Sequence, residues 1–362
     1  MCNQPPGWQT IGMSEALGQK RNLRRVWIVD EGSPGHLAQS RGLANALSAE
    51  IPALETTEIR VVRRFSGWQR SLLRWLMGSA GKSAPTFIEQ RILVDTNVPG
   101  APPDLILSSG GKSVFLGRML ANRYGAPYVF IGERKPYPSE WFHTVFTPSS
   151  LETGVNDVPI ELIPTAVTPE KARQAAATFE CADERVWAMV IGGRSRSHPY
   201  TPADWQALAA GMNALTQRTG IRWLLTTSRR TGAAAEALLQ ASLDPGALAH
   251  AIWWSEKPEK QMLAILGRAE RVFVTQDSVT MVTECVAAGR AVVVLAPEHV
   301  RFPAKSFLPA YYQRLESGGR VQRVKLSEFA ELQADRIEPI SAGDNGNYLN
   351  ELARALMQRF QH

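Results

Sequence analysis

Three ionisable side chains stand in a glycine-rich turn near the start of the chain, where a strand is predicted to lead into a helix. The apolar run Val26 to Val29 is followed by Asp30, Glu31, Gly32, Ser33, Pro34, Gly35 and His36, and then by a helical pattern. Two glycines are more than a plain turn needs, and they would let a ligand approach the backbone. Histidine titrates near neutral pH, and a carboxylate can also take a proton from a hydroxyl. The turn therefore offers His36, Glu31 and Asp30 as alternative general bases, unless His36 only occupies the helix start without a catalytic role.

A second turn of this kind follows the apolar run Leu105 to Leu107. Two serines and two glycines lead there into Lys112 and Ser113. Lysine and hydroxyl donors beside glycine N–H groups are typical of anion sites. We expect the two turns together to bind an acceptor substrate or its phosphate. The predicted acceptor-binding residues are Gly32, Gly35, Gly110, Gly111, Lys112 and Ser113.

Two clusters of arginines and hydroxyls follow strands in the second half of the chain. Residues 192–197 read GGRSRS and residues 226–231 read TTSRRT. Glycine N–H groups with arginine and serine donors can cradle a phosphate or diphosphate. The spacing fits neither the GxxxxGK[ST] phosphate loop nor the GxGxxG dinucleotide motif, and the alternative is two glycine or hydroxyl turns with exposed arginines. The residues predicted to bind the diphosphate are Gly192, Gly193, Arg194, Ser195, Arg196, Thr227, Ser228 and Arg229.

The stretch TQDSVTMVTE, residues 275–284, predicts a further part of the same site. Ser278 is expected to cap a helix that begins at the next residue, which leaves the free N–H groups of its first turn for an anion. Glu284 falls within this helix in an apolar stretch, where its carboxylate could accept hydrogen bonds from two ribose hydroxyls. The alternative is a solvated helix acid. Asp277 and Met281 complete the predicted donor residues on this helix.

Strands and helices alternate along the chain, which is typical of parallel, doubly wound sheets. The predicted elements include a strand over Glu58–Val62, a strand over Trp223–Ser228, a helix over Lys257–Leu266 and a final helix over Tyr348–Phe360. Ligands of such sheets bind beyond the carboxyl ends of the strands, and every turn described above falls at such an end.

The alternating pattern pauses near Ile163 to Pro169 and then resumes. We therefore predict two α/β domains, residues 23–165 and residues 166–345. Residues 1–22 are expected to form a loose arm. Residues 346–362 are expected to form a C-terminal helix that packs back on the first domain.

The composition indicates a globular protein, since 44% of the 362 residues are hydrophobic and 20% are charged. No apolar run is long enough to span a membrane, and the N-terminus lacks the pattern of a secretory signal. Cys2, Cys181 and Cys285 lie far apart, which is typical of a cytoplasmic protein without a disulfide framework or zinc site. The net charge is +6, but no nucleic-acid-binding motif is present, so nucleic acid is not an expected partner.

The basic charge is concentrated between Arg60 and Lys82, where six basic residues and no acidic residue occur. Trp68 and Trp75 are seven residues apart and share one face of a predicted helix. Such a helix could lie on an anionic membrane or meet an acidic partner, or it could pack its apolar face on the core with arginines outward. The residues predicted to face a membrane are Trp68, Arg70, Leu72, Arg74 and Trp75.

Four of these stretches resemble a known family. DEGSPGHLAQSRGLANAL, IGGRSRS, LLTTSRRT and VTQDSVTMVTECVAAGRAVVVL are similar to the bacterial branch of the mitochondrial-fission family named for elongated mitochondria in plants. The resemblance covers nearly the whole chain, from Arg24 to the C-terminal helix. That family is in turn similar to GT-B glycosyltransferases, notably the peptidoglycan N-acetylglucosaminyltransferase that makes lipid II.

The resemblance implies a GT-B fold, in which two Rossmann-like, doubly wound domains face a cleft. It implies an acceptor site at the turn with His36 and a nucleotide-sugar site at the helix with Glu284. Glu284 is the part of the family's C-terminal motif that is intact here, whereas Asp277, Ser278 and Met281 replace a serine, a glycine and a threonine.

The implied activity is inverting transfer of a sugar from a nucleotide-activated donor to a lipid-linked or cell-envelope glycan. The resemblance implies no metal or other cofactor for this reaction. The expected location is the cytoplasm, with the basic segment available for peripheral attachment to the inner membrane. A sugar-nucleotide 2-epimerase and a non-catalytic GT-B membrane adaptor remain open as alternatives.

Overall fold

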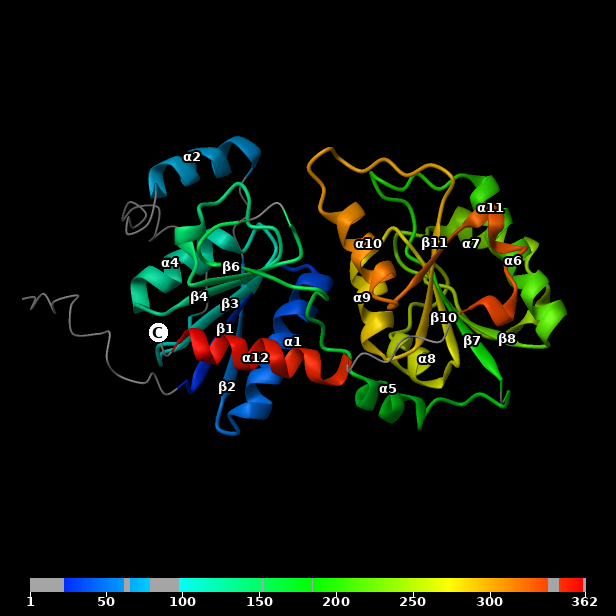
Figure 1. The fold of residues 1–362 in the computed structure, drawn as a ribbon, viewed down its shortest axis with the longest axis horizontal. Coiled ribbons are helices and arrows are strands. Elements are labelled where there is room, and N and C mark those ends of the chain that lie inside the picture. The colour runs from blue at the N-terminus through cyan, green and yellow to red at the C-terminus, as the bar shows by residue number, and fades with distance from the viewer. Residues whose placement is uncertain are drawn as a thin grey trace, which may run out of the picture.

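The computed structural model describes residues 23–61, 66–78, 98–150, 153–183, 185–337 and 345–360. Within these residues, each half of the chain forms a parallel six-stranded sheet flanked by helices (Figure 1). This is the two-domain α/β architecture that the alternating pattern predicts. The fold is GT-B, with two Rossmann-like domains.

The first sheet has the strand order β2-β1-β3-β4-β5-β6, and the second has the order β12-β11-β10-β7-β8-β9. The strands of the first sheet are β1 (Arg25–Asp30), β2 (Glu55–Arg60), β3 (Leu105–Ser109), β4 (Tyr128–Ile131), β5 (Thr144–Thr147) and β6 (Asp157–Pro159). The strands of the second sheet are β7 (Val186–Val190), β8 (Arg222–Thr226), β9 (Leu248–Ile252), β10 (Arg271–Thr275), β11 (Ala291–Ala296) and β12 (Gln322–Lys325).

The α-helices connect these strands and cover the sheets. Those of the first half are α1 (Pro34–Glu50), α2 (Gly67–Met77) and α4 (Val114–Tyr124). Those that follow are α5 (Pro169–Ala176), α6 (Pro202–Thr219), α7 (Ala233–Ser242), α8 (Met262–Arg268), α9 (Val279–Ala287), α10 (Leu308–Ser317), α11 (Leu326–Phe329) and α12 (Asn345–Arg359).

The strand orders decide where a ligand can bind. In each sheet the order reverses between two neighbouring strands, β1 and β3 in the first sheet and β7 and β10 in the second. A crevice opens beyond the carboxyl ends of strands at such a switch point. Glu31 to His36 and Gly110 to Ser113 follow the first pair of strands, and Gly192 and Asp277 follow the second. The predicted site residues therefore lie at both switch points.

Two predicted elements differ from the structure. The second strand is Glu55–Arg60 rather than Glu58–Val62, because it is an edge strand whose side chains are mostly exposed and show no apolar run. The predicted helix over Lys257–Leu266 begins only at Met262. The N–H groups of Glu256 and Lys257 instead close a turn on the Trp253 carbonyl. The short edge strands β6, β9 and β12 have too few buried residues to give a sequence signal.

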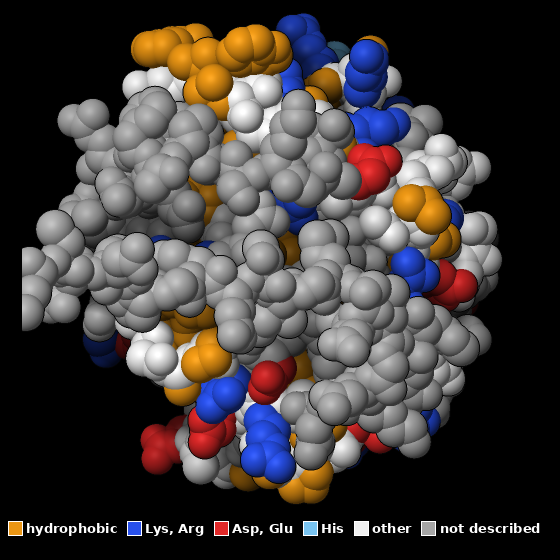
Figure 2. Space-filling model, turned by 90° about the vertical axis from the view of Figure 1, so that its left-hand side faces the viewer, with side chains coloured by type: hydrophobic (Ala, Val, Ile, Leu, Met, Phe, Trp, Pro, Cys, Tyr) orange, Lys and Arg blue, Asp and Glu red, His pale blue; other side chains and the backbone are white. Residues whose placement is uncertain are grey.

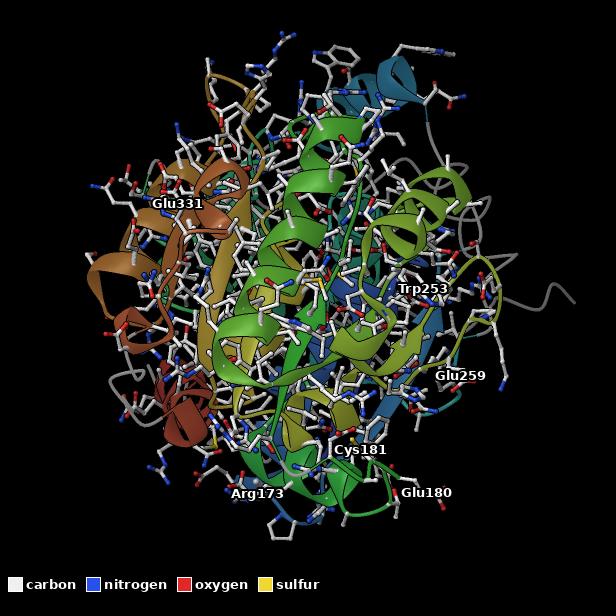
Figure 3. The ribbon with its side chains drawn as sticks, turned by 90° about the vertical axis from the view of Figure 1, so that its right-hand side faces the viewer. Arg173, Glu180, Cys181, Trp253, Glu259 and Glu331 are labelled. Carbon is white, nitrogen blue, oxygen red and sulfur yellow. The ribbon has the colours of Figure 1, made fainter. Side chains whose placement is uncertain are left out.

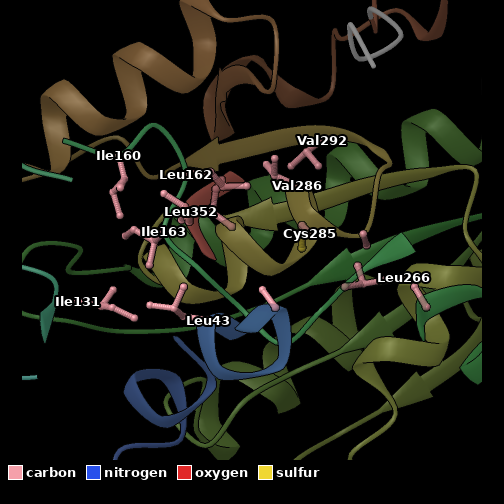
Figure 4. Packing of buried hydrophobic residues seen from close by; sticks show 14 of the residues in the cluster. Leu43, Ile131, Ile160, Leu162, Ile163, Leu266, Cys285, Val286, Val292 and Leu352 are labelled. Atoms are coloured by element: carbon pink, nitrogen blue, oxygen red, sulfur yellow. The ribbon is translucent and has the colours of Figure 1, made fainter. Parts of the chain in front are cut away.

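One hydrophobic cluster crosses from the first domain to the second. It contains Leu43 of α1, Ile163 of the linker, Cys285 of α9 and Leu352 of α12 (Figure 4). Burial of this shared apolar surface stabilises the junction of the domains.

The C-terminal helix α12 lies against α1 of the first domain (Figure 1). Nε of Arg354 is 2.9 Å from Oε1 of Glu50, and Nε of Arg359 donates to Oγ1 of Thr144 at 3.2 Å. The chain thus returns to its first domain after completing the second.

Candidate functional site

The side chains of Glu31 and His36 form a dyad at the carboxyl end of β1. Nδ1 of His36 lies 2.6 Å from Oε1 of Glu31, while the backbone N–H of Lys112 donates to Oε2 at 2.8 Å. Burial raises the pKa of Glu31, but the contact with His36 and the Lys112 N–H outweigh it and hold this pKa below its ordinary value. The ionised carboxylate selects the tautomer of His36 that has its proton on Nδ1, which leaves Nε2 free to accept a proton.

His36 is accessible whereas Glu31 is not. The side chain of His36 is 40% exposed, and that of Glu31 is 4% exposed. The pair thus has the arrangement of an orienting carboxylate behind a histidine that can reach a substrate. The sequence presented these two residues as alternatives, but the structure places them in contact.

The glycine at position 110 makes the dyad possible. Its φ of +88° lies in the left-handed region, and a Cβ there would stand 2.3 Å from Nδ1 of His36 and 2.5 Å from the Glu31 carboxylate. Ser113 supports this turn. Its Oγ contacts the Gly110 carbonyl at 2.7 Å and Oγ of Ser108 at 2.9 Å. Ser113 is fully buried and supports the turn, whereas Lys112 is exposed and can reach a ligand.

The remaining predicted residues of the first turn shape the backbone. Oδ1 of Asp30 accepts a hydrogen bond from the N–H of Gly32 at 2.7 Å, and Gly32 has a φ of +82°. Asp30 therefore fixes the turn that carries Glu31. Gly35 lies in the first turn of α1, where it meets the second domain.

In the second domain, the side chain of Asp277 packs under the loop that is predicted to bind an anion. Its side chain has no exposed surface, and its Oδ2 lies 2.6 Å from a guanidinium nitrogen of Arg230. A Cβ on Gly192 would come within 2.2 Å of the same carboxylate. Burial raises the pKa of Asp277, although Arg230 and the Gly193 N–H oppose that rise. Asp277 thus holds the loop in place and does not present its carboxylate to a ligand.

The two arginine–hydroxyl clusters pack on each other. Oγ of Ser228 and Oγ1 of Thr231 both donate to the Gly192 carbonyl, the latter at 2.8 Å. Oγ1 of Thr227 donates to the buried carboxylate of Glu236 at 2.5 Å. These hydroxyls are used to join the clusters. Four arginines of this loop pair are exposed, and one of them, Arg230, is paired with Asp277. The other three are Arg194, Arg196 and Arg229.

The helix α9 begins as expected at a serine cap. Oγ of Ser278 accepts from the Met281 N–H at 3.4 Å, and α9 runs from Val279 to Ala287. The N–H groups of its first turn lie beyond the carboxyl end of β10, where they and the helix dipole favour an anion.

Glu284 and Met281 of α9 line a cavity of about 290 Å³ beside the second sheet. Thr227, Ser228 and the indole of Trp254 line it from the other side. Burial raises the pKa of Glu284 to about 7. A half-buried carboxylate in a cavity with apolar and aromatic walls suits a nucleoside, whose hydroxyls would donate to the acid and whose base would contact the walls.

The segment between β9 and α8 forms the outer wall of this cavity. Figure 3 shows Trp253 and Glu259 on this segment at the edge of the second domain. Glu259 also lines the cavity, and its Oε1 lies 2.7 Å from Nζ of Lys257. This wall was not predicted from the sequence, because a helix was expected over Lys257–Leu266, which includes Glu259.

The two predicted half-sites meet at the start of α1 and of α9. A Cβ on Gly35 would lie 2.8 Å from Oγ1 of Thr280, so the first turns of these helices are in contact. His36 is the next residue of α1. The histidine of the first domain is thus one residue from the contact with the helix whose N-terminus favours an anion in the second.

Further residues of the site were missed by the sequence reasoning. Tyr200 donates to Oδ1 of Asp277 at 3.3 Å, and Oγ1 of Thr275 accepts from the Gly192 N–H at 2.8 Å. Oη of Tyr137 donates to the Gly111 carbonyl at 3.1 Å. Isolated tyrosines and threonines have no motif, so only the fold could bring them to the turns.

The predicted membrane segment is the helix α2. Trp68 and Trp75 are 69% and 76% exposed, and Leu72 is 46% exposed. The helix packs Leu73 and Met77 on the core, as the alternative expects, whereas its face with the two tryptophans is exposed. In the part of the chain that the structure describes, no helix is long and apolar enough to cross a membrane, and no group of three His, Cys, Asp or Glu side chains could hold a metal ion.

Comparison with known sequences identifies one family. The sequence model of the family described as mitochondrial fission ELM1 matches residues 34–359. A search of curated proteins found no matching sequence.

Solved structures with the same fold include several UDP-N-acetylglucosamine 2-epimerases. One is a protein from Listeria monocytogenes considered to be such an enzyme, with 13% identity, a TM-score of 0.58 and coverage of 94% of this chain and 97% of that one. Another is the Methanocaldococcus jannaschii enzyme in complex with UDP-GlcNAc and UDP, with 11% identity, a TM-score of 0.53 and coverage of 92% and 99%. The Neisseria meningitidis enzyme bound to UDP-GlcNAc has 13% identity, a TM-score of 0.52 and coverage of 92% and 100%. These likenesses show the fold.

Proposed function

The chain belongs to the mitochondrial fission ELM1 family, and we propose that it is an inverting glycosyltransferase that uses a nucleotide-activated sugar. One observation carries the proposal: the Glu31–His36 dyad of one domain lies beside the start of α9 in the other, through the contact of Gly35 with Thr280. A base and an anion site on facing domains are what transfer between two substrates requires.

The donor would bind to the second domain. Its nucleoside would enter the cavity with Glu284, Met281 and Trp254, and its diphosphate would lie at the N-terminus of α9. Two solved structures with this fold hold UDP-GlcNAc, which supports a nucleotide sugar as the ligand class. Arg194, Arg196 and Arg229 would offset the negative charge that develops on the leaving diphosphate, so we propose transfer without a metal ion.

The acceptor would bind to the first domain, at the turns around Gly32, Gly111 and Lys112. His36 Nε2 would take the proton from the acceptor hydroxyl while its oxygen attacks the anomeric carbon of the sugar. The bond from that carbon to the diphosphate breaks in the same step. Glu31 would stabilise the imidazolium that forms. We propose a lipid-linked or cell-envelope glycan as the acceptor.

A thermal-shift screen tests the donor part of this proposal. UDP, GDP, CMP, ADP, dTDP and their sugars are each added to the wild-type protein and to Glu284→Ala. We expect one nucleotide to raise the melting temperature of the wild type and to have little effect on the variant. Glu259→Ala is the matched control, because Glu259 lines the same cavity but pairs with Lys257 at the surface. If no nucleotide stabilises the wild type, the proposal is wrong and the non-catalytic adaptor is favoured.

A further inference from the structure

The helix α2 presents an apolar face to solvent that no described part of the chain covers. Trp68, Leu72 and Trp75 follow helical spacing and are 69%, 46% and 76% exposed. Figure 2 shows hydrophobic side chains gathered at the rim of the molecule where α2 lies, with Lys and Arg side chains beside them. Such a patch is unusual on a protein that has no partner for it.

The opposite side of α2 anchors it to the first domain. Leu73 and Met77 are buried there. The Gly78 carbonyl, at the end of the helix, accepts a hydrogen bond from Nε1 of Trp141 at 2.7 Å. The start of the helix is closed by a capping box of Ser66 and Gln69. The tryptophans are therefore held outward by a fixed helix.

The end of α2 is linked to the acceptor turn through two aromatic side chains. The ring of Trp141, which donates to the Gly78 carbonyl at the end of α2, has its centroid 5.6 Å from that of Tyr137. Tyr137 in turn donates to the Gly111 carbonyl. The helix thus joins an exposed apolar face to the turn that also holds the dyad.

The charge around the apolar face of α2 indicates which kind of partner it would bind. Neither α2 nor its flanking residues from Arg60 to Lys82 include an acidic residue, whereas Arg60, Arg70 and Arg74 are basic. Tryptophan prefers the boundary between lipid and water, and an anionic bilayer attracts basic residues that lie near its surface. A protein partner or a second copy of this chain would have to bring both an apolar groove and acidic residues.

We propose that the α2 face of Trp68, Leu72 and Trp75 docks on an anionic lipid bilayer, and that Arg70 and Arg74 of the same helix receive anionic headgroups. The acceptor would then be an amphiphile that the protein takes directly from the membrane. The uptake of an acceptor from the membrane rests on the proposed function, whereas the docking of α2 does not.

Vesicle flotation of the full-length protein tests the docking. Vesicles of phosphatidylcholine alone are compared with vesicles that also contain phosphatidylglycerol. We expect binding to the anionic vesicles only. Trp68→Ser and Trp75→Ser should each reduce the partition coefficient about tenfold. Arg70→Gln and Arg74→Gln should each reduce it about fivefold. Val155→Ser is the matched control, since Val155 is 80% exposed outside α2 and should have no effect.

The outcomes separate the possible partners. Absence of vesicle binding, or binding that the tryptophan variants do not weaken, would overturn the proposal. A dimer in light scattering that Trp68→Ser and Trp75→Ser dissociate, without vesicle binding, would instead identify a second copy as the partner. Thermal shift by the nucleotide is measured on the same variants. If it is retained, a failure of docking does not reflect failure of the donor site.

Discussion

Nδ1 of His36 lies 2.6 Å from Oε1 of Glu31, and a Cβ on Gly110 would displace both side chains. The carboxylate is buried and the imidazole is accessible. This asymmetry makes Glu31 the positioning residue and His36 the group that can touch a substrate. Each of the following predictions depends on this pair or on the donor cavity opposite it.

Glu31→Gln should reduce turnover of the nucleotide sugar by about 10²-fold to 10⁴-fold, since the histidine loses the group that sets its tautomer. Nucleotide affinity should stay unchanged, because Glu31 belongs to the other domain. Asp30→Asn is the matched control: its amide oxygen can still accept from the Gly32 N–H, so turnover should remain near that of the wild type. Loss of turnover in Asp30→Asn but not in Glu31→Gln would make Asp30 the base.

Neighbouring glycines of the second turn should respond differently to alanine. Gly110→Ala forces a left-handed φ and a clash with the dyad, so we expect a stability loss of about 1–3 kcal/mol together with lost turnover. Gly111 has open space at its Cβ position and no left-handed φ, so Gly111→Ala should fold with the stability of the wild type and keep the dyad in place. Chemical denaturation and steady-state assays measure both effects. Equal behaviour of the two variants would contradict the geometry of the turn.

The stability of the protein should fall as pH rises from about 4.5 to about 7 because of Glu284. Its pKa is higher in the folded than in the unfolded protein, so the folded state binds more protons in this window and loses that advantage as they dissociate. The loss is at most about 3 kcal/mol. Glu284→Gln should not show this loss and should be the more stable protein at pH 8 in urea denaturation. A variant with the wild-type pH dependence would show that another group is responsible.

Nucleotide binding near pH 7 should release up to about half a proton per site. Ribose hydroxyls that donate to Glu284 stabilise its ionised form and thereby lower its raised pKa. Calorimetry in buffers of different ionisation enthalpy measures this proton release. Glu284→Gln should bind without it, and release that persists in the variant would exclude Glu284 as the source.

Two buried tyrosines should differ in their effect on the donor site. Oη of Tyr311 contacts Oγ1 of Thr283 in α9 at 2.9 Å and accepts from the linker N–H of Ile163 at 3.3 Å. Oη of Tyr348 accepts from the neighbouring linker N–H, that of Leu162 at 3.3 Å, and within the described ranges it has no hydrogen bond to α9. Each Tyr→Phe variant should lose about 1–3 kcal/mol of stability. Only Tyr311→Phe should also weaken nucleotide binding, because it alone removes a hydrogen bond to α9. Equal nucleotide affinities in the two variants would show that α9 does not depend on this contact.

The sequence predicted the sheets and the turns well because both depend on local signals. Buried strands such as Val186–Val190 form continuous apolar runs, and the cap at Ser278 is a short-range motif that the structure confirms. The strand over Glu55–Arg60 was misplaced, because the register with β1 rather than apolar periodicity sets its limits.

The site itself was only partly predictable. His36 and Glu31 could be chosen from their types, but their pairing depends on Gly110, which is 74 residues further along than His36. Asp277 looked like a ligand residue, and only the fold shows that Gly192 covers it. The orientation of α2 could not be predicted either, since an apolar stripe reads the same whether the core or a membrane faces it.

The most direct test of the central claim is to follow a nucleotide sugar by NMR with wild-type protein and with His36→Asn. The donor is the nucleotide sugar found in the screen, and membrane lipid extract supplies the acceptor. We predict release of the nucleoside diphosphate with loss of the donor's anomeric signal, at a rate that falls at least about 10²-fold in the variant. Conversion of the donor to its 2-epimer, or release that His36→Asn leaves unchanged, would contradict transfer by this dyad.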